Sequence, residues 1–388
     1  MLTAHRHAAR VFAPLVSRRF SLAAPGQPPY RVLFFGTDDV SLATLKLLHA
    51  NSHAERGDDR LIEHIEVVCP SDRPMNGRKK DEPVPVKKFA QRCGLKVFDT
   101  PAHLKSLKTW DFPVTDNFDV GVVVSFGYFL HPHMLKNLLH GAINMHPSLL
   151  PKYRGPAPIH HALLNGDSTT GVSVIEIDPK AFDVGRILLQ ERFDIKPSIQ
   201  CQELTTELAS FGADCIVKTL ACLPAHKKSA IVQDDAVACK APKLKFKDGL
   251  ISFKEPASDI FHRWQALSNS VGMNVQFRER MVKLIEIRLP TAEELQSVEA
   301  DEARNEPAEI GTFFFEKKRQ ALWLRCANDS WLLITKLQQA DRKIGTALDF
   351  CNGYRLKNMQ RERFEKTVDT SCQLRTSHEQ IQHAYRSK

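Results

Sequence analysis

The sequence predicts an α/β protein in which a parallel sheet is followed by a small β-barrel. Up to about residue 220, apolar strand-like runs alternate with helical patterns, which is typical of a parallel sheet covered by helices. Beyond about residue 270, short apolar runs separated by turns replace this alternation, and such runs favour a barrel. The chain has 388 residues, of which 43% are hydrophobic, so it can form two cores.

The first part contains five strand candidates, of which one is the short strand end at 141–144. The run 118–127 is almost continuous in β-branched and apolar residues, as expected of a strand buried on both faces. Helical spacing is seen at Leu204, Leu208, Phe211 and Cys215, and Pro224 should end that unit. The other strand candidates are 31–36, 62–68 and 171–178.

In the second part, residues 224–243 have no clear periodicity and resemble a linker. A helix is expected around 260–267. The acidic stretch 293–309 is interpreted as a solvated loop insertion between strands. The strand candidates are 282–287, 311–315, 321–325 and 331–336.

Composition narrows the class of protein. The net charge of +9 favours a polyanionic partner without proving one. Nine scattered cysteines include no C-x-x-C pair, so neither a zinc site nor a secreted disulfide framework is expected. No apolar run is long enough to span a membrane, and the sequence predicts a soluble protein, with a monomer as the default.

Residues 1–29 differ from the rest of the chain. They contain four arginines and several Ser, Ala and Leu residues, and no acidic residue precedes Asp38. An acid-free, Arg- and Ser-bearing start is typical of a mitochondrial presequence, although some disordered basic arms have a similar composition. We therefore expect the mitochondrial matrix as the location.

A possible catalytic set combines an amide, an imidazole and a carboxylate. His146 follows a predicted strand end at 141–144, and Asn144, two residues before it, points to the same side of the strand. In open α/β sheets, ligands bind at the carboxyl ends of strands. Asp183 lies in a turn with Gly185, where its carboxylate can orient or protonate an imidazole. Acyl transfer between nitrogens needs such an oxyanion donor, proton shuttle and orienting carboxylate.

These residues resemble the signature of the folate-dependent formyltransferases. The similar segments are Asn-x-His-Pro-Ser-Leu-Leu-Pro from Asn144, Arg-Gly-Pro-Ala-Pro from Arg154, and Asp-x-Gly from Asp183. The resemblance implies a Rossmann-like formyltransferase domain at 30–223, a linker at 224–243, an OB-like barrel at 244–356 and a basic tail at 357–388. It also implies that Asn144, His146 and Asp183 are catalytic, that 10-formyltetrahydrofolate donates the formyl group, and that no metal is needed. The implied folate-binding residues are Ser148, Leu149, Leu150, Pro151, Phe126 and Gly127.

A basic loop and the C-terminal barrel are similar to parts of those family members that formylate methionyl-tRNA. In the loop, residues 69–80 combine Pro, Gly and Asn with four cations, and Arg78 is the best candidate for entering the acceptor stem. Phosphate contacts of this kind give affinity but little sequence information. The implied tRNA-binding residues are Arg73, Arg78, Lys79, Lys80, Lys243 and Lys245.

Two alternatives share the same fold. A formyltransferase acting on a small amine would keep the Asn-His-Asp set but would need neither the basic loop nor the barrel. A non-catalytic tRNA-binding protein would not need the intact set. The first strand ends at Gly36-Thr37 without a G-x-G-x-x-G fingerprint, so dinucleotide binding is not favoured.

Overall fold

The computed structural model describes residues 26–55, 60–74, 81–302 and 307–365. The expected presequence lies outside the described residues except for 26–29, as does most of the expected tail. Arg78, Lys79 and Lys80 of the basic loop also lie outside them.

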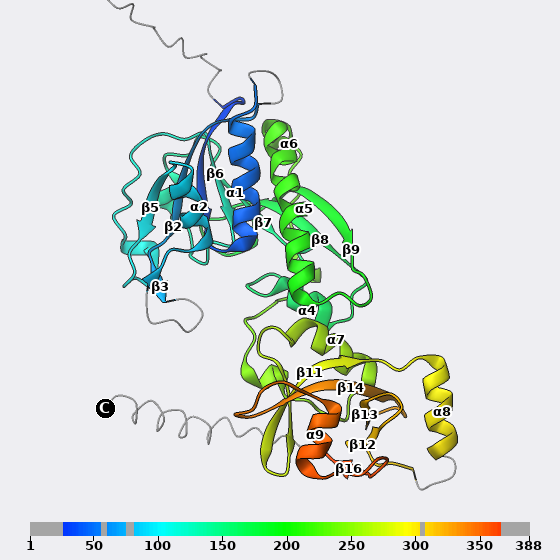
Figure 1. The fold of residues 1–388 in the computed structure, drawn as a ribbon. Coiled ribbons are helices and arrows are strands. Elements are labelled where there is room, and N and C mark those ends of the chain that lie inside the picture. Colours follow the sequence, from blue (N-terminus) through cyan, green and yellow to red (C-terminus); the bar gives the residue numbers. More distant parts are fainter. Residues whose placement is uncertain (1–25, 56–59, 75–80, 303–306, 366–388) are drawn as a thin grey trace, which may run out of the picture.

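The first part is a seven-stranded sheet in the order β5-β2-β1-β6-β7-β8-β9 (Figure 1). The parallel arrangement expected from the sequence is confirmed for the first five strands, whereas β8 and β9 add an antiparallel edge. The strands are β1 Tyr30–Gly36, β2 Ile62–Pro70, β5 Lys96–Thr100, β6 Val120–Val124, β7 Ala142–His146, β8 Thr169–Glu176 and β9 Ile187–Asp194.

Helices cover one face of this sheet, where α1 (Asp39–Ser52) and α5 (Cys201–Ala221) pack side by side (Figure 1). Alternate residues of β1 enter different cores, as a strand buried on both faces requires. Phe34 belongs to the large core that continues into the second part, whereas Phe35 belongs to the core on the other face, where its ring packs edge-on against Phe126 at 5.4 Å between centroids. The remaining helices of this part are α2 Pro85–Arg92, α3 Pro132–Leu135, α4 Pro158–Leu164 and α6 Leu223–Lys228.

Pro224 does not end the helical unit, contrary to expectation. It lies in the first turn of α6, which begins two residues after α5 ends. A proline is tolerated there because the first N–H groups of a helix have no intrahelical partner.

The second part is an antiparallel sheet in the order β10-β11-β14-β13-β12-β16. A bridge between Gln276 and Glu365 joins the two ends of this sheet, and Phe313 stacks on Phe364 inside it at 4.2 Å between ring centroids. Its strands are β10 Met273–Phe277, β11 Arg280–Arg288, β12 Thr312–Glu316, β13 Ala321–Arg325, β14 Trp331–Gln339, β15 Gly345–Thr346 and β16 Glu362–Arg363, and its helices are α7 Ala257–Leu267, α8 Ala292–Glu302 and α9 Ala347–Tyr354.

The stretch 293–309 is not a solvated loop. Most of it forms helix α8, whose Val298 is buried against Trp323 and Trp331 on the outer side of the sheet. Glu294 binds Arg288 and Arg319, so part of the acidic charge is neutralised within the fold. The helix was not expected because only a few apolar residues lie among many acidic ones in this stretch.

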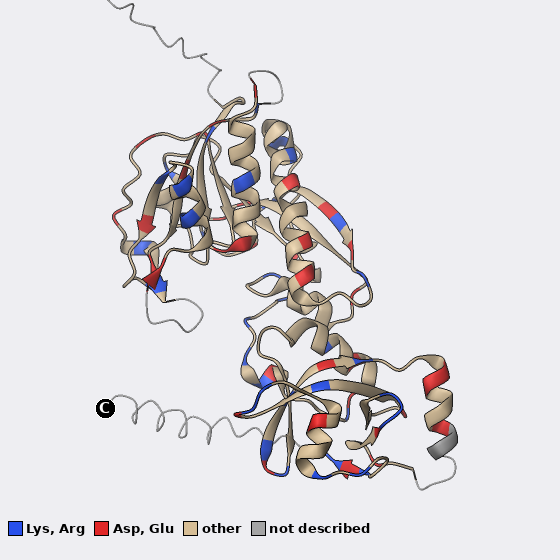
Figure 2. Cartoon of the chain, in the orientation of Figure 1, with Lys and Arg blue, Asp and Glu red and all other residues tan. Residues whose placement is uncertain are grey.

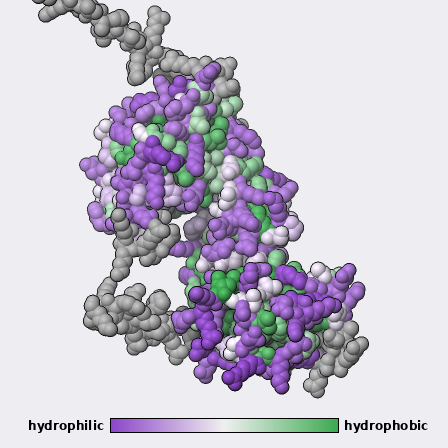
Figure 3. All heavy atoms as spheres, viewed as in Figure 1, coloured by the Kyte–Doolittle hydropathy of each residue, from purple (hydrophilic) through white to green (hydrophobic). Residues whose placement is uncertain are grey.

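Residues 229–250 connect the two parts and remain in contact with the first sheet. Ile231 pairs with Ile187 of β9, and Lys240 pairs with Arg154. Helix α7 packs against α4, and Gln265 of α7 donates hydrogen bonds to the carbonyls of Pro197 and Ile199. The two lobes therefore meet through a narrower waist, which Figure 3 shows from one side.

Candidate active site

Asn144 and His146 lie at the carboxyl end of β7, between β6 and β8. Their spacing of two residues places both side chains on one face of the sheet. His146 is only 5% exposed, whereas Asn144 is partly exposed. Asn144 makes no side-chain hydrogen bond within the described part of the chain, so its amide is available to a ligand. The strand extends to His146, two residues further than the sequence indicated.

The imidazole of His146 is held between two groups. Its Nε2 lies 2.9 Å from the carbonyl oxygen of Tyr153, and since a carbonyl can only accept, Nε2 carries a proton. Its Nδ1 lies 3.6 Å from Oδ1 of Asp183. This separation is too long for a direct hydrogen bond, and it leaves Nδ1 able to share a proton with a third oxygen.

Asp183 occupies a constrained turn. Its φ of 58° is in the left-handed region, which is uncommon for a residue other than glycine. Its Oδ2 accepts a hydrogen bond from the N–H of Gly155 at 2.9 Å. Gly185 is required two residues later, because a Cβ there would lie 1.7 Å from the carbonyl oxygen of Glu176. The sequence-predicted trio of Asn144, His146 and Asp183 is thus brought to the same end of the sheet.

The loop after His146 is fixed by buried polar contacts. Ser173 of β8 accepts a hydrogen bond from the N–H of Leu150 at 3.0 Å and donates one to the carbonyl of Ser148 at 2.7 Å. Gln190 of β9 donates to Ser173 and to the carbonyl of Leu150, both at 2.9 Å. Ser148 and Leu150 are buried, whereas Leu149 and Pro151 are partly exposed. The loop therefore offers only some of the expected folate-binding side chains to a ligand.

The turn after β6 lies beside the amino end of α1. Ser125 donates to the Asp38 carboxylate at 2.5 Å, and Thr37 donates to the carbonyl of Phe126 at 3.0 Å. Phe126 is buried, and Gly127 is exposed with a φ of 83°. The backbone at Gly127, rather than the ring of Phe126, is accessible to a ligand.

Two aromatic rings lie next to this constellation. Phe182, which precedes Asp183, is 61% exposed. Its ring packs edge-on against Phe129 at 4.9 Å between centroids. The exposed ring of Phe182, supported by the partly buried ring of Phe129, is a suitable contact for a planar or apolar ligand group.

The sequence analysis did not identify the contacts that two residues, Gln233 and Arg154, make beside Asp183. Gln233 is 8% exposed and donates to the carbonyls of Asp183 and Gly185 at 2.9 and 2.8 Å. Arg154 donates from Nε to Oε1 of Gln233 at 2.9 Å and from Nη1 to Asp235 at 2.8 Å. Arg154 was noticed only as part of the Arg-Gly-Pro-Ala-Pro segment, and nothing in the local pattern around Gln233 signals its role.

The three predicted tRNA-binding residues that the structure describes are solvent-exposed. Arg73 lies on β3 (Arg73–Pro74), which pairs with β4 (Asp81–Glu82) at the base of the basic loop. Lys243 and Lys245 are exposed in the connecting segment, and they make no ion pair with any described residue. Figure 2 shows Lys and Arg along this segment and the adjoining rim of the second sheet.

The loop base itself is anchored by a buried cation. Lys87 of α2 lies 2.6 Å from Asp72 and 2.7 Å from Asp99. Burial alone lowers the pKa of Lys87, but hydrogen bonds to Asp72 and Asp99 outweigh it and raise the pKa above its ordinary value. Lys87 thus stays charged and holds the residue before Arg73 in place.

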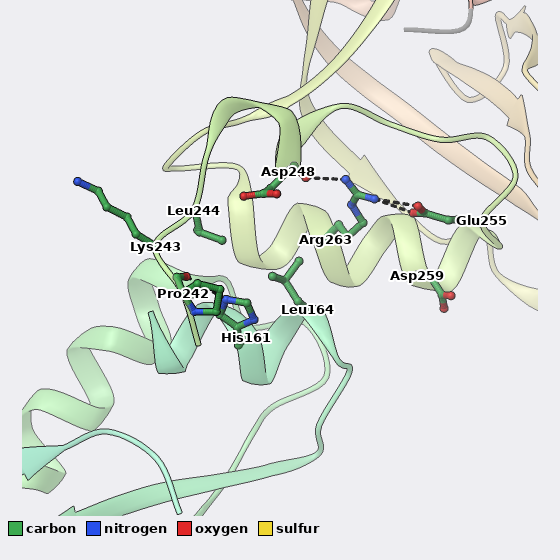
Figure 4. Close-up of a pocket in the computed structure, with 9 residues that line it drawn as sticks. All are labelled: His161, Leu164, Pro242, Lys243, Leu244, Asp248, Glu255, Asp259 and Arg263. Atoms are coloured by element: carbon green, nitrogen blue, oxygen red, sulfur yellow. Dashed lines mark hydrogen bonds and ion pairs between the residues drawn. The ribbon is translucent and has the colours of Figure 1, made fainter. Parts of the chain in front are cut away.

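A cavity of about 410 Å³ lies at the junction of the two parts, between α4 and α7 (Figure 4). Its Arg263 is already bound to Glu255 and to the carbonyl of Asp248, and Lys243 extends away from it. None of Asn144, His146 and Asp183 lines this cavity, so it is separate from the constellation at the end of β7.

Neither a membrane-spanning helix nor a metal-ligand cluster is found among the residues that the structure describes. No described helix is long and apolar enough to cross a membrane. No group of three or more His, Cys, Asp or Glu residues in the same ranges has the arrangement of a metal site.

Two family models match the chain, "formyl transferase" over residues 30–220 and "formyl transferase, C-terminal domain" over residues 243–355. Together with the sheet and the barrel, they define the class of enzyme as a two-part formyltransferase. The chain belongs to the methionyl-tRNA formyltransferase branch of that family, as its relatives indicate.

Among these relatives, human mitochondrial methionyl-tRNA formyltransferase is 34% identical over 331 residues, covering 84% of this chain and 78% of the relative. Methionyl-tRNA formyltransferase of Moorella thermoacetica is 32% identical over 326 residues, covering 84% and 96%. A solved sugar 3N-formyltransferase, WlaRD, studied with dTDP and 5-N-formyl-THF, shares the fold with a TM-score of 0.53 at 16% identity, covering 81% of this chain and 98% of that one.

Proposed function

We propose that this protein transfers the formyl group of 10-formyltetrahydrofolate to the α-amine of methionyl-tRNA. The observation that carries the proposal is the meeting of Asn144, His146 and Asp183 at the end of β7. Relatives of this chain are named for the same activity, and they include both mitochondrial and bacterial proteins.

Formyl transfer replaces one carbon–nitrogen bond by another, and this reaction determines which groups the side chains must provide. The α-amine attacks the formyl carbon, a new C–N bond forms, and negative charge develops on the formyl oxygen. In our proposal the Asn144 amide and Nδ1–H of a protonated His146 donate to that oxygen. Each such donor is typically worth about 3 kcal/mol in the transition state.

Protons must move in both directions for the intermediate to collapse. The attacking nitrogen loses a proton as the new bond forms, and N10 of the folate gains one as the old C–N bond breaks. We assign this transfer to Asp183, either directly or through an ordered water bound to its carboxylate. The buried position of His146 limits competition from bulk water.

For the formyl donor, we propose that the folate lies over the turn at Gly127 and beside Leu149 and Pro151. These are the expected folate residues that the structure leaves accessible. Ser148, Leu150 and Phe126 shape the same surface from beneath, since their side chains are buried. We infer no part for a metal, because the formyl group is already activated on nitrogen.

For the acceptor, we propose that the tRNA backbone is bound by Lys243, Lys245 and Arg73, together with Arg78, Lys79 and Lys80. Those of these cations that the structure describes are exposed, which suits contacts with phosphate.

In this proposal residues 30–223 perform the chemistry, 224–243 link the two parts, and 244–356 bind the tRNA. We place the reaction in the mitochondrial matrix, with residues 1–29 as the presequence.

The test is the product formed from labelled 10-formyltetrahydrofolate. We expect label on charged initiator methionyl-tRNA and none on small amines such as amino sugars. Transfer only to small amines would replace methionyl-tRNA by a small acceptor. Binding of tRNA without any transfer would instead indicate a non-catalytic tRNA-binding protein.

A further inference from the structure

We infer that Gln233, in the segment connecting the two parts, is a positioning residue for Asp183. The inference rests on the proposed function, because it assigns Gln233 a part in the formyl transfer for which Asp183 supplies the carboxylate. The side chain of Gln233 is hydrogen-bonded to Asp183, Gly185 and Arg154 and not to His146, so its effect is exerted through the backbone of the Asp183 turn.

The contacts of Gln233 use its whole side-chain amide. The NH2 group donates one hydrogen bond to the carbonyl of Asp183 and one to that of Gly185, at 2.9 and 2.8 Å. Its Oε1 accepts a hydrogen bond from Nε of Arg154 at 2.9 Å. A glutamine that is 8% exposed and has both ends bound cannot rotate without leaving buried polar groups unpaired.

The turn that Gln233 holds needs such support. Asp183 has a φ of 58°, a conformation that costs free energy for a residue with a side chain. The surrounding structure must therefore hold it in place. Gln233 binds the turn at two points, the carbonyls of Asp183 and Gly185. By holding the backbone at Asp183, it helps to set the direction in which the Asp183 side chain leaves the backbone.

The same network reaches the Asp183 carboxylate from its other side. Arg154 is bound by Gln233, and the next residue, Gly155, donates its N–H to Oδ2 of Asp183 at 2.9 Å. The backbone of Arg154 is itself paired with the connecting segment, since its N–H donates to Cys239 and its carbonyl accepts from Ala241. Both the backbone and the carboxylate of Asp183 are thus tied to the one segment.

The connecting segment is fastened on either side of Gln233. Ile231 exchanges two backbone hydrogen bonds with Ile187 of β9, at 2.8 and 2.9 Å. Beyond Gln233, the pairing with Arg154 fixes residues 239–241. Gln233 therefore belongs to a segment that lies outside the sheet, contacts the Asp183 turn and leads directly to the second part.

The principal variant is Gln233→Glu, which keeps an acceptor for Arg154 but replaces the NH2 donor by a carboxylate oxygen. The matched control is Gln265→Glu. Gln265 is also buried, and its amide also donates to two carbonyls two residues apart, those of Pro197 and Ile199. Any effect of burying a carboxylate that accepts but cannot donate is common to both variants.

For Gln233→Glu we expect kcat to fall by about 10- to 100-fold, because small displacements of a catalytic group have effects of this size. KM for the formyl donor and for methionyl-tRNA should stay within about twofold of wild type. For Gln265→Glu we expect a comparable fall in thermal midpoint without the fall in kcat of the folded protein. If Gln233→Glu does not fold, Gln233→Asn replaces it, since its neutral amide is one methylene too short to reach both carbonyls.

A double-mutant cycle separates positioning from general destabilisation. In the background of Asp183→Asn, where the carboxylate is already absent, Gln233→Glu should lower the residual transfer rate by less than about twofold. Equal losses of kcat in Gln233→Glu and Gln265→Glu, or full additivity with Asp183→Asn, would overturn the inference. Wild-type kcat in Gln233→Glu would do the same, whereas a wild-type protein without any formyl transfer would overturn the proposed function itself.

Discussion

The end of strand β7 and the lysine-bearing segment at Lys243 and Lys245 differ in how their side chains are held. His146 is buried and lies between Tyr153 and Asp183. Asp183 is held in turn by Gly155, which binds its carboxylate, and by Gln233, which binds its carbonyl. Lys243 and Lys245 are exposed and make no ion pair with any described residue. The first region fixes atoms in space, whereas the second supplies charge.

This difference predicts two kinds of response to mutation. A group that must be within a fraction of an ångström of the reacting atoms affects the rate of the chemical step when it is removed. An exposed cation contributes to a summed field that salt screens, so its removal affects binding modestly and in a salt-dependent manner.

The largest effect is expected for His146→Ala. Loss of a positioned acid or base and oxyanion donor should lower kcat by about 10²- to 10⁴-fold. The affinity for methionyl-tRNA should change little, because His146 is buried away from the exposed cations. Single-turnover formyl transfer measures the rate, and filter binding measures the affinity. A variant that keeps its rate, or loses tRNA binding in parallel, would contradict the division between the two regions.

A second large effect is expected for Ser173→Ala, which removes a buried contact rather than a reacting group. The hydroxyl of Ser173 binds the N–H of Leu150 and the carbonyl of Ser148, and both would remain buried without a partner. We expect the free energy of unfolding to fall by about 1–3 kcal/mol. Urea denaturation measures this change. The control is Ser270→Ala, where the serine donates to a single carbonyl, that of Leu267, and the loss should be smaller.

The proximity of Asn144 and His146 at the end of β7 could be predicted from the sequence alone. Asn144 and His146 are two residues apart on one strand, so the period of a strand alone places them together. Asp183 could be included because a Gly-bearing turn signals a tight loop. Gln233 could not be predicted, since its partners are backbone carbonyls 50 and 48 residues away in sequence.

The misread elements have equally specific causes. Helix α8 has an acidic surface and buries only a narrow stripe that includes Val298, which a composition-based interpretation cannot distinguish from a loop. Strand β9 was not among the strand candidates, and most of it alternates buried and exposed residues, as an antiparallel edge strand does. Residues 224–228 of the expected linker belong to helix α6, whereas residues 229–243 lack periodicity because their contacts are isolated bridges and side-chain hydrogen bonds.

A smaller effect is expected for the double variant Lys243→Ala/Lys245→Ala. If each lysine contacts one phosphate, KM for methionyl-tRNA rises and the slope of log affinity against log salt falls by about 0.7–0.9 per cation removed. The value of kcat should not change. Lys46→Ala on α1, also exposed, is the matched control. An unchanged salt slope in the double variant would show that these lysines are merely solvated.

The smallest effect on function is expected for Glu294→Gln, which tests whether a dense polar network by itself implies a role in the reaction. The carboxylate of Glu294 on α8 accepts hydrogen bonds from the Arg288 side chain, the backbone N–H of Thr291 and the Arg319 side chain. These contacts, with Arg288 the largest contributor, lower the pKa of Glu294 to about 2. A carboxylate whose pKa is lowered on folding stabilises the protein above its unfolded pKa of about 4.5, and this contribution is lost as the pH falls toward 2.

Glu294→Gln should therefore be less stable than wild type at pH 7, and the difference should begin to shrink as the pH falls below about 4.5. Thermal midpoints of both proteins between pH 7 and pH 3.5 measure it. Because α8 packs on the outer side of the second sheet and contacts neither His146 nor Lys243, kcat and KM at pH 7 should equal those of wild type. A loss of kcat would mean that the two sheets are coupled more tightly than the contacts between α4 and α7 indicate. A stability difference that stays constant with pH would mean that Glu294 acts through packing rather than through its charge.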